Sequence, residues 1–256
     1  MTARKTSLVH VGCSGFSYEH WKGVFYPEGL PKSKWFDYYC GKFGTVELNV
    51  TFYRLPREST FLKWHEQTPG DFLVSIKGSR FITHVKKLKD PALPLKRFFE
   101  SIKPLWDKIG AVLWQLPPAF KADAERLENF LKELKPYKAS NAFEFRNESW
   151  VRDERVLCAL SDEGCALCMA DWPEFARDLP LTADFVYMRR HGHGTYGGSY
   201  TTEELREDAG RIKKFRHEGR EVYIYFNNDA YGYAPKNAME LDRLVSAKKN
   251  MVHGKK

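Results

Sequence analysis

Short apolar runs alternate with amphipathic stretches from one end of the chain to the other. Short apolar runs are typical of buried strands, and apolar positions that recur about every 3.6 residues indicate helices. This pattern predicts strands over residues 8–13, 45–53, 72–77, 111–116, 142–146, 165–170, 185–190 and 222–226. It predicts helices over residues 33–43, 59–67, 95–108, 123–134, 153–161, 203–217 and 237–247.

Regular alternation of strands and helices predicts a parallel sheet with helices on its outside. Eight strands in a chain of 256 residues favour a closed TIM-type (β/α)8 barrel over an open sheet. Because no Gly/Ser-rich or Pro-rich linker interrupts the pattern, we expect one barrel domain over residues 1–247. The basic segment over residues 248–256 is expected to be a mobile tail.

Composition narrows the class of protein. The chain is 43% hydrophobic and 29% charged, which excludes a disordered or collagen-like protein. No apolar run approaches the roughly 18 residues of a membrane span, and residues 1–7 lack the apolar core of a secretory signal. We therefore expect a cytoplasmic protein without a membrane partner. The net charge of +8 favours anionic partners, either small molecules or nucleic acid.

The five cysteines do not form the paired pattern of a disulfide framework. Cys165 and Cys168 have the spacing of a metal or redox pair, but they lie in a predicted buried strand. Residues three apart on a strand point to opposite faces, so we expect both thiols to pack in the core without converging.

Polar side chains collect where the predicted strands end. In TIM-type barrels the carboxyl ends of the strands form the active face, which we call the mouth. We interpret the following residues as substrate-binding: Ser14, Tyr18, Asn49, Tyr53, Lys77, Gln115, Arg146, Trp150, Asp171, Arg189, His191 and Asn227.

Several of these residues belong to sequence blocks that occur together and in order between Gly12 and Ala238. The blocks are GCSGFSYEHWKGVFYP, ELNVTFYRLP, WQLPP, FEFRNESW, RRHG and YFNNDAYGYAPKNA. In them the chain resembles the YecE-like family, domain-of-unknown-function family 72. Cys13, Val50 and Asn147 stand where Thr, Ser and His are usual. The resemblance implies a bacterial or archaeal TIM-type barrel, and it implies no particular reaction.

Glu47 and Glu144 are the candidate catalytic residues, because each is a carboxylate inside an otherwise apolar strand. An unpaired buried charge is costly, so each needs compensation. One alternative is structural: Glu144 pairs with Arg146, and Glu47 pairs with Arg189 or Lys77. The other is catalytic: one carboxylate has a raised pKa and transfers protons.

Cations at the same strand ends indicate an anion site. If Lys77, Arg146, Arg189 and Arg190 face one mouth, their charge exceeds that of the two glutamates, and we expect an anion near Arg146 and Arg189. The glycine-rich loop over residues 191–200 precedes a capping-box pattern, Thr201 to Glu204, and can either bind phosphate or simply connect two elements.

A metal site has weaker support. His191, His193, Asp171, Glu47 and Glu144 are available ligands, but no metal-binding spacing appears in the sequence, and the cofactor stays unknown with a divalent metal as an alternative.

Two functions fit these patterns. The first is an enzyme of hydrolase or isomerase type that acts at the mouth on an anionic, phosphate-bearing substrate, with nucleic acid among the candidates. The second is a non-catalytic binding module for nucleic acid or an anionic metabolite. Neither the substrate nor the oligomeric state follows from the sequence.

Overall fold

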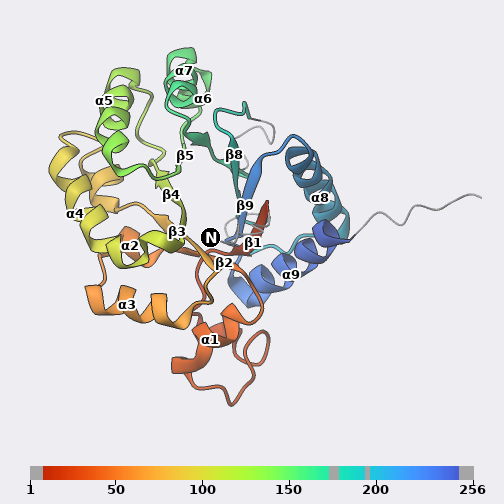
Figure 1. Ribbon diagram of the computed structural model, residues 1–256. Helices are drawn as coiled ribbons and strands as arrows, with labels where there is room; N and C mark the ends of the chain where they lie inside the picture. Colours follow the sequence, from red (N-terminus) through yellow and green to blue (C-terminus); the bar gives the residue numbers. More distant parts are fainter. Residues whose placement is uncertain (1–7, 173–178, 194–196, 248–256) are drawn as a thin grey trace, which may run out of the picture.

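Parallel strands form the centre of the molecule, and helices surround them (Figure 1). The computed structural model describes residues 8–172, 179–193 and 197–247. Its strands are β1 (Val9–Cys13), β2 (Thr45–Leu48), β3 (Leu73–Lys77), β4 (Ile109–Gln115), β5 (Asn141–Glu144), β6 (Ala166–Leu167), β7 (Met169–Ala170), β8 (Phe185–Arg190) and β9 (Glu221–Phe226).

The strands pair in chain order around a closed ring. All pairs are parallel, in the orders β1-β9-β8-β7 and β2-β3-β4-β5-β6. A bridge between Ser14 and Glu47 joins the β1 side to β2. β6 and β7 are two halves of one strand interrupted at Cys168, whose amide donates to the Phe143 carbonyl (2.8 Å). The predicted TIM-type (β/α)8 barrel is therefore confirmed.

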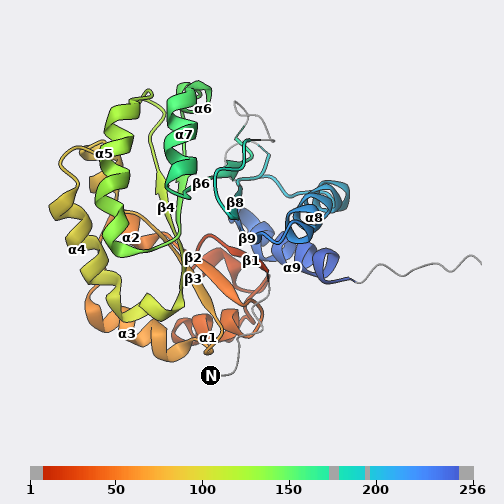
Figure 2. The same ribbon diagram turned by 45° about the horizontal axis from the view of Figure 1, so that its top comes forward.

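Nine α-helices lie in the described part of the chain, most of them on the outside of the barrel (Figure 2). They are α1 (Trp35–Cys40), α2 (Val50–Tyr53), α3 (Glu58–Gln67), α4 (Ala92–Ile102), α5 (Ala124–Leu134), α6 (Ser149–Arg152), α7 (Glu154–Asp162), α8 (Thr202–His217) and α9 (Tyr233–Ser246). Short 3-10 helices are Glu19–Trp21, Lys32–Lys34, Lys103–Lys108, Lys135–Tyr137 and Ala230–Gly232, and Phe81–Val85 is a π-helix.

The helix ends follow the local chemistry of the sequence. Asp123 caps α5 as predicted, accepting a hydrogen bond from the Arg126 amide (3.1 Å). The capping box of Thr201 and Glu204 is present at the start of α8. Pro104 limits α4, because proline cannot continue an α-helix, and the chain continues from Lys103 as a 3-10 helix.

Two hydrophobic cores form because alternate strand residues point to opposite sides of the wall. The larger one lies between strands and helices and is rich in Phe, Leu and Trp. The smaller one fills the barrel and includes Ala142, Leu113, Tyr187 and Tyr223. Gly110 makes room for it, because a Cβ there would lie 2.6 Å from Tyr223 Cε1.

Two details bear on the predictions. β2 ends at Leu48, and Val50–Tyr53 forms helix α2, so the expected strand over residues 45–53 was too long. Cys165 packs in the larger, outer core and Cys168 in the smaller one inside the barrel, which confirms that the two thiols do not converge.

The tail over residues 248–256 lies outside the described residues. Among those described, no helix combines the length and the apolarity that a membrane span requires.

Candidate functional site: a carboxylate–arginine network at the barrel mouth

The inward direction of the key side chains follows from strand alternation. Thr45 and Ser75 both contact the Tyr225 hydroxyl inside the barrel, at 2.7 and 2.9 Å. Side chains two residues apart on a strand point to the same face. Glu47 and Lys77 therefore point inward as well, one step closer to the mouth.

Arg189 on β8 connects the two candidate catalytic glutamates. Its Nε and Nη2 donate to Glu47 Oε2 and Oε1 at 3.1 and 2.8 Å, and its Nη1 donates to Glu144 Oε2 at 2.7 Å. Ser14 Oγ and the Tyr187 hydroxyl each donate to Glu47 at 2.7 Å. Arg189 is only 1% exposed and both glutamates are fully buried. The structural alternative, in which arginines pair with these carboxylates, is what the structure contains.

The pKa values of both glutamates are lowered. Burial alone would raise them, but the charge of Arg189 and its hydrogen bonds outweigh burial at Glu47. At Glu144 the charges of Arg146 and Arg189 hold the pKa well below its ordinary value. Both side chains are therefore ionised at neutral pH. The interpretation in which one of them has a raised pKa is wrong, because each lies against a buried guanidinium.

Arg146, in the turn directly after β5, extends the network outward. Its Nε forms an ion pair with Glu144 Oε1, and its Cζ lies 4.0 Å from the ring centroid of Trp172. Nη2 lies 3.1 Å from His191 Nε2, and His191 Nδ1 lies 3.0 Å from Asn227 Nδ2. Within the described residues Nη1 of Arg146 has no hydrogen-bond partner. Arg146 is thus fixed on several sides and retains donor capacity.

His191 is held in the neutral form. Burial lowers its pKa, and the positive charge of Arg189 acts in the same direction. Since a guanidinium only donates hydrogen bonds, His191 Nε2 accepts from Arg146. The imidazole is therefore an acceptor toward the network and adds no charge to it.

Lys77, at the end of β3, has a different environment from the arginines. Its Nζ lies 4.3 Å from the ring centroid of Phe52. Burial, followed by the charge of Arg189, lowers the pKa of Lys77 to about 8. No hydrogen bond or ion pair to Nζ is found in the described part of the chain. Of the two partners considered for Glu47, Arg189 is the one found in these residues, and it binds both oxygens of Glu47.

Asp171 anchors the loop that follows β8. Its Oδ1 accepts a hydrogen bond from the His191 amide (2.7 Å), and its Oδ2 accepts one from the Tyr200 hydroxyl. The same hydroxyl accepts a hydrogen bond from the Gly192 amide (2.6 Å). Part of the glycine-rich loop, residues 194–196, lies outside the described residues, so its phosphate-binding role stays a prediction.

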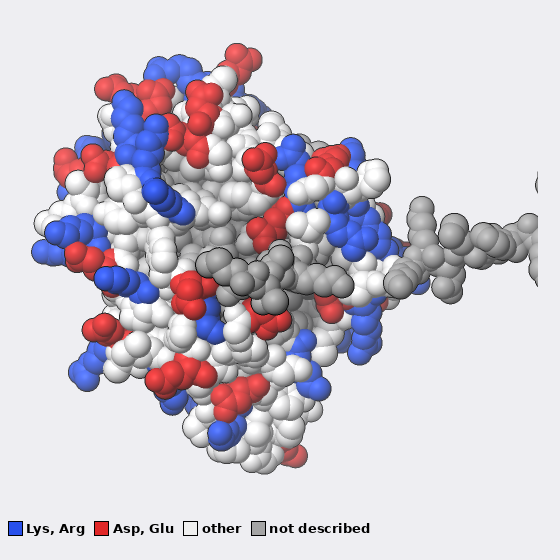
Figure 3. Space-filling view, in the orientation of Figure 1, with Lys and Arg blue, Asp and Glu red and all other residues white. Residues whose placement is uncertain are grey.

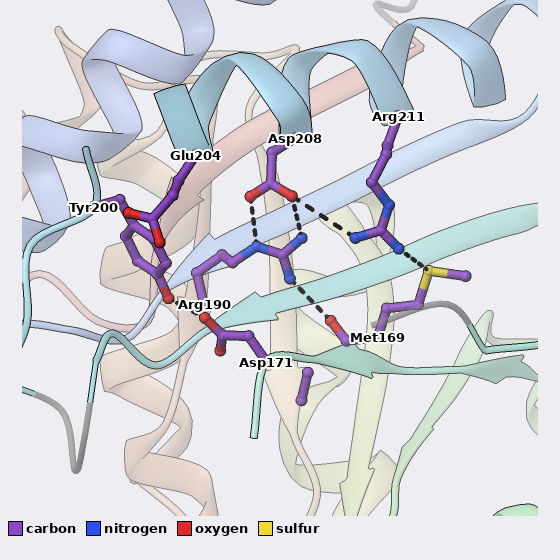
Figure 4. A pocket seen from close by; sticks show the side chains of 8 residues that line it. Met169, Asp171, Arg190, Tyr200, Glu204, Asp208 and Arg211 are labelled. Atoms are coloured by element: carbon purple, nitrogen blue, oxygen red, sulfur yellow. Dashed lines mark hydrogen bonds and ion pairs between the residues drawn. The ribbon is translucent and has the colours of Figure 1, made fainter. Parts of the chain in front are cut away.

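Arg190 does not face the mouth. It points to the opposite side of β8, where Nε and Nη2 donate to the Asp208 carboxylate of α8 at 2.6 and 2.5 Å (Figure 4). The cavity beside this pair, which Arg211 and Glu204 also line, has a volume of about 10 Å³. That is roughly the space that one water molecule needs. The expected contribution of Arg190 to a positive mouth is therefore wrong.

The remaining candidates differ in their position. Gln115 lies inward beside Glu144 in the β4–β5 register, and the Tyr18 hydroxyl donates to the Ser14 carbonyl at 2.6 Å. Asn49 follows β2, and its Oδ1 is buried without a hydrogen-bond partner among the described residues.

Two predicted binding residues lie away from the network. Trp150 is fully buried in the outer core, where its indole N–H donates to the Phe120 carbonyl (2.6 Å) and its ring stacks on Phe145. Tyr53 is 78% exposed on α2 and packs edge-on against Phe52. Both follow a strand in sequence, but a helical turn carries each away from the barrel axis.

Tyr187 belongs to the network and was not predicted. It lies two residues before Arg189 on β8, so strand alternation places both side chains on the same face. That spacing was the signal that could have identified it.

The donor set does not resemble a metal centre. In the described part of the chain, no group of three or more His, Cys, Asp or Glu side chains is arranged to hold an ion. Arg189 lies between Glu47 and Glu144 and binds both oxygens of Glu47 and Oε2 of Glu144, while Glu144 Oε1 forms an ion pair with Arg146. His193, another suggested ligand, contacts Glu204 in an exposed position away from these carboxylates.

Surface charge does not single out a large basic area on the face drawn in Figure 3. Lys and Arg side chains are interspersed there with Asp and Glu around the periphery. A strong nucleic-acid footprint is typically a patch of one sign. On this face the net charge of +8 is therefore not concentrated.

Comparison with known proteins identifies relatives along most of the chain. The family described as "Protein of unknown function DUF72" matches residues 10–256. The UPF0759 protein YunF of Bacillus subtilis is 23% identical, covering 93% of this chain and 95% of that protein. The UPF0759 protein YecE of Escherichia coli is 29% identical over 50% of this chain and 44% of that protein.

Comparison with solved structures also identifies a DUF72 family protein. A DUF72 family protein of Thermotoga maritima is 32% identical, with a TM-score of 0.82 over 94% of this chain and all of that one. D-psicose 3-epimerase, at 11% identity and a TM-score of 0.56, is similar in fold alone. The fold, the family match and the sequence blocks agree, and the chain belongs to the DUF72 family.

Proposed function

We propose that this protein is an enzyme that acts at the barrel mouth on a substrate bearing an anionic group. The observation that carries the proposal is the pair of spare donors above the buried network, Arg146 Nη1 and Lys77 Nζ. Neither has a protein acceptor within the described residues. Arg146 is also held in place by Glu144 and Trp172, and a preorganised guanidinium suits phosphate or carboxylate.

The position of the network supports a functional role. Ion pairs buried in a protein are often no more stabilising than apolar residues of similar volume, because each charge loses its hydration. The inner core of this barrel is otherwise built mainly from uncharged side chains, with Ala, Leu, Tyr and Cys in its apolar cluster. The charges lie instead at the end where TIM-type barrels carry out their chemistry. A role in function explains buried charges at this position better than a role in stability does.

The roles differ between residues in this proposal. Glu47 and Glu144 stay ionised and fix the two arginines, so they are positioning residues. Arg146 binds the anionic group, and Lys77, with its pKa lowered to about 8, is the group able to exchange a proton near neutral pH. His191 has a lowered pKa, stays neutral and acts as a hydrogen-bond acceptor. A small anionic molecule fits best, because Arg146 is only 5% exposed. We expect the protein to act in the cytoplasm.

Turnover of a defined mixture tests the proposal. The purified protein is incubated with phosphorylated and carboxylated metabolites, and each compound is followed by mass spectrometry. We expect at least one compound to be depleted, and Arg146→Ala to slow its depletion by about 10²-fold or more, as loss of a charged binding contact does.

Arg152→Ala is the matched control, because Arg152 pairs with Glu148 on the exposed surface of α6. It should leave the rate unchanged. Binding of anions without depletion of any compound would contradict the proposal and favour the non-catalytic binding module. A nucleic acid as the true substrate would instead show binding that weakens steeply with salt.

A further inference from the structure

We propose that Lys77 is a reactive amine that forms an imine with the carbonyl group of the substrate. The inference rests on the proposed function in placing the active site at the mouth, and it adds the chemical class of the substrate. That class is a small aldehyde or ketone, including 2-keto acids, that also carries a carboxylate or phosphate for Arg146.

The geometry presents the amine to the mouth without a protein partner. Lys77 is the last residue of β3 and has the same inward orientation as Ser75. Thr51 Oγ1 donates to the Lys77 carbonyl at 2.7 Å, which fixes the strand end. The two buried carboxylates that could have formed an ion pair with Nζ are bound by arginines instead.

The surroundings favour the uncharged amine. Nζ lies against the apolar ring of Phe52, and guanidinium groups lie nearby. A lysine desolvated beside other cations is the usual arrangement of an amine nucleophile. The charged groups that act on it are Glu47, Glu144, Arg146 and Arg189. His84 is the titratable group on which Lys77 acts, together with Arg80.

A lowered pKa of about 8, against an ordinary 10.5, agrees with this placement. At pH 7 about 10% of such an amine is neutral, compared with about 0.03% for an ordinary lysine. The neighbouring His84 shows the same influence, because burial and the charge of Lys77 lower its pKa to about 4. The ring of His84 therefore adds no positive charge near Lys77 at neutral pH.

The step balances without a further reagent. The lone pair of neutral Nζ forms a bond to the carbonyl carbon as the C=O π bond breaks toward oxygen. One proton of the nitrogen then passes through solvent to that oxygen, giving a neutral carbinolamine. Loss of that hydroxyl with the second amine proton releases one water and leaves the C=N bond. A proton from solvent then gives the iminium, which withdraws electrons from the adjacent carbon.

Reductive trapping on the full-length protein tests the inference. The probes are pyruvate and hydroxyacetone, which share a three-carbon ketone skeleton and differ in the anionic group. Sodium cyanoborohydride reduces the imine to a stable amine, and peptide mass spectrometry locates it. Lys77 should be labelled at least tenfold faster than Lys96, an exposed lysine of α4, at pH 7. The rate at Lys77 should rise with a midpoint near pH 8.

The outcomes separate this inference from the proposed function. Faster labelling by pyruvate than by hydroxyacetone, with the preference lost in Arg146→Ala, supports both. Equal labelling of Lys77 by the two probes, at a rate above that of Lys96, supports Lys77 as a reactive amine and contradicts the anion-binding role of Arg146. If neither probe labels Lys77 faster than Lys96, Lys77 is not a reactive amine and this inference is overturned. The turnover test of the proposed function is unaffected by that result. Because mapping is done on the unaltered chain, the test does not depend on the folding of a Lys77→Met variant.

Discussion

Two consecutive arginines of β8 place nearly the same chemistry in two different regions. Arg189 points into the barrel and binds Glu47 and Glu144, whereas Arg190 points outward and binds Asp208 of α8. Both arginines are almost completely buried. The cavity beside Arg190 has a volume of only about 10 Å³, and the donors of Arg190 are taken up by Asp208 and backbone carbonyls (Figure 4). Its hydrogen bonds join a strand to a helix, which is a structural task.

The region around Arg189 differs because the network continues toward the mouth and ends in spare donors. Arg146 retains Nη1, and the amine of Lys77 lies over the Phe52 ring without a hydrogen bond or ion pair among the described residues. Full satisfaction of buried polar groups rigidifies a structure. A network that ends in unpaired donors instead retains hydrogen-bonding capacity that a ligand can use. Buried charge alone therefore does not mark a functional site. The unpaired edge of the network distinguishes the mouth from the contact with α8.

Replacing each arginine by alanine should lower the free energy of unfolding by different amounts in the two regions. Arg189→Ala leaves two fully buried carboxylates without their main partner, so we expect a loss of about 3–5 kcal/mol in the free energy of unfolding. Arg190→Ala should cost less, because Arg211 lies 3.8 Å from Asp208 and can compensate part of its charge. Urea denaturation measures both, with Arg152→Ala as the exposed control. An equal or larger loss for Arg190→Ala would contradict this ranking.

Acid should weaken the mouth network in a defined pH range. The pKa of Glu144 lies well below its ordinary value of 4.5 in the folded state, and that of Glu47 is also lowered. Their stabilisation is present above about pH 4.5 and is lost as the pH falls toward the folded values. The slope is at most about 1.4 kcal/mol per pH unit for each carboxylate.

The variant Glu144→Gln tests this pH dependence. It should be less stable than the unaltered protein at pH 7 and should show a shallower loss of stability below pH 4.5. Glu148→Gln, which alters an exposed ion pair, should retain the original slope. An unchanged slope in Glu144→Gln would show that Glu144 does not contribute to the acid transition.

The smallest effect is expected at the start of α8. Thr201→Ala removes the capping box with Glu204, which should cost about 1 kcal/mol of stability. Glu204 of the capping box lines the cavity beside Arg190 and Asp208 and does not contact the carboxylate–arginine network. Binding of anions at the mouth should therefore not change. Thermal unfolding with and without phosphate measures both effects. Weaker phosphate binding in this variant would mean that α8 contributes to the ligand site.

The strand pattern predicted the barrel because each apolar run is bounded by polar turns, and alternation fixed which residues point inward. β8 matched the predicted range, residues 185–190, in full. The end of β2 was misjudged, because Val50 and Phe52 favour strands locally but form a helical turn. That turn is stabilised by Thr51, which donates to the carbonyls of Leu48 and Lys77.

Within the candidate site, the pairing of Glu144 with Arg146 was accessible from sequence, because the two residues are neighbours along the chain. The pairing of Glu47 with Arg189 was one of two alternatives, but the second bond of Arg189, to Glu144 45 residues away, was not predicted, because it depends on how β5 and β8 face each other across the barrel. The same limit applies to Arg190, whose side of the strand follows from alternation but whose partner Asp208 depends on how α8 packs. Trp150 shows the converse error, because closeness to a strand end in sequence did not place it at the mouth.

Phosphate-dependent thermal unfolding of a matched pair of variants tests most directly whether the mouth, and not the α8 contact, is the ligand site. The pair is Arg146→Ala at the mouth and Arg211→Ala beside Asp208. Ligand binding to the folded state alone raises the unfolding temperature with concentration. We predict that phosphate stabilises the unaltered protein and Arg211→Ala alike, and that most of this stabilisation disappears in Arg146→Ala. Equal stabilisation of Arg146→Ala, or its loss only in Arg211→Ala, would contradict the account.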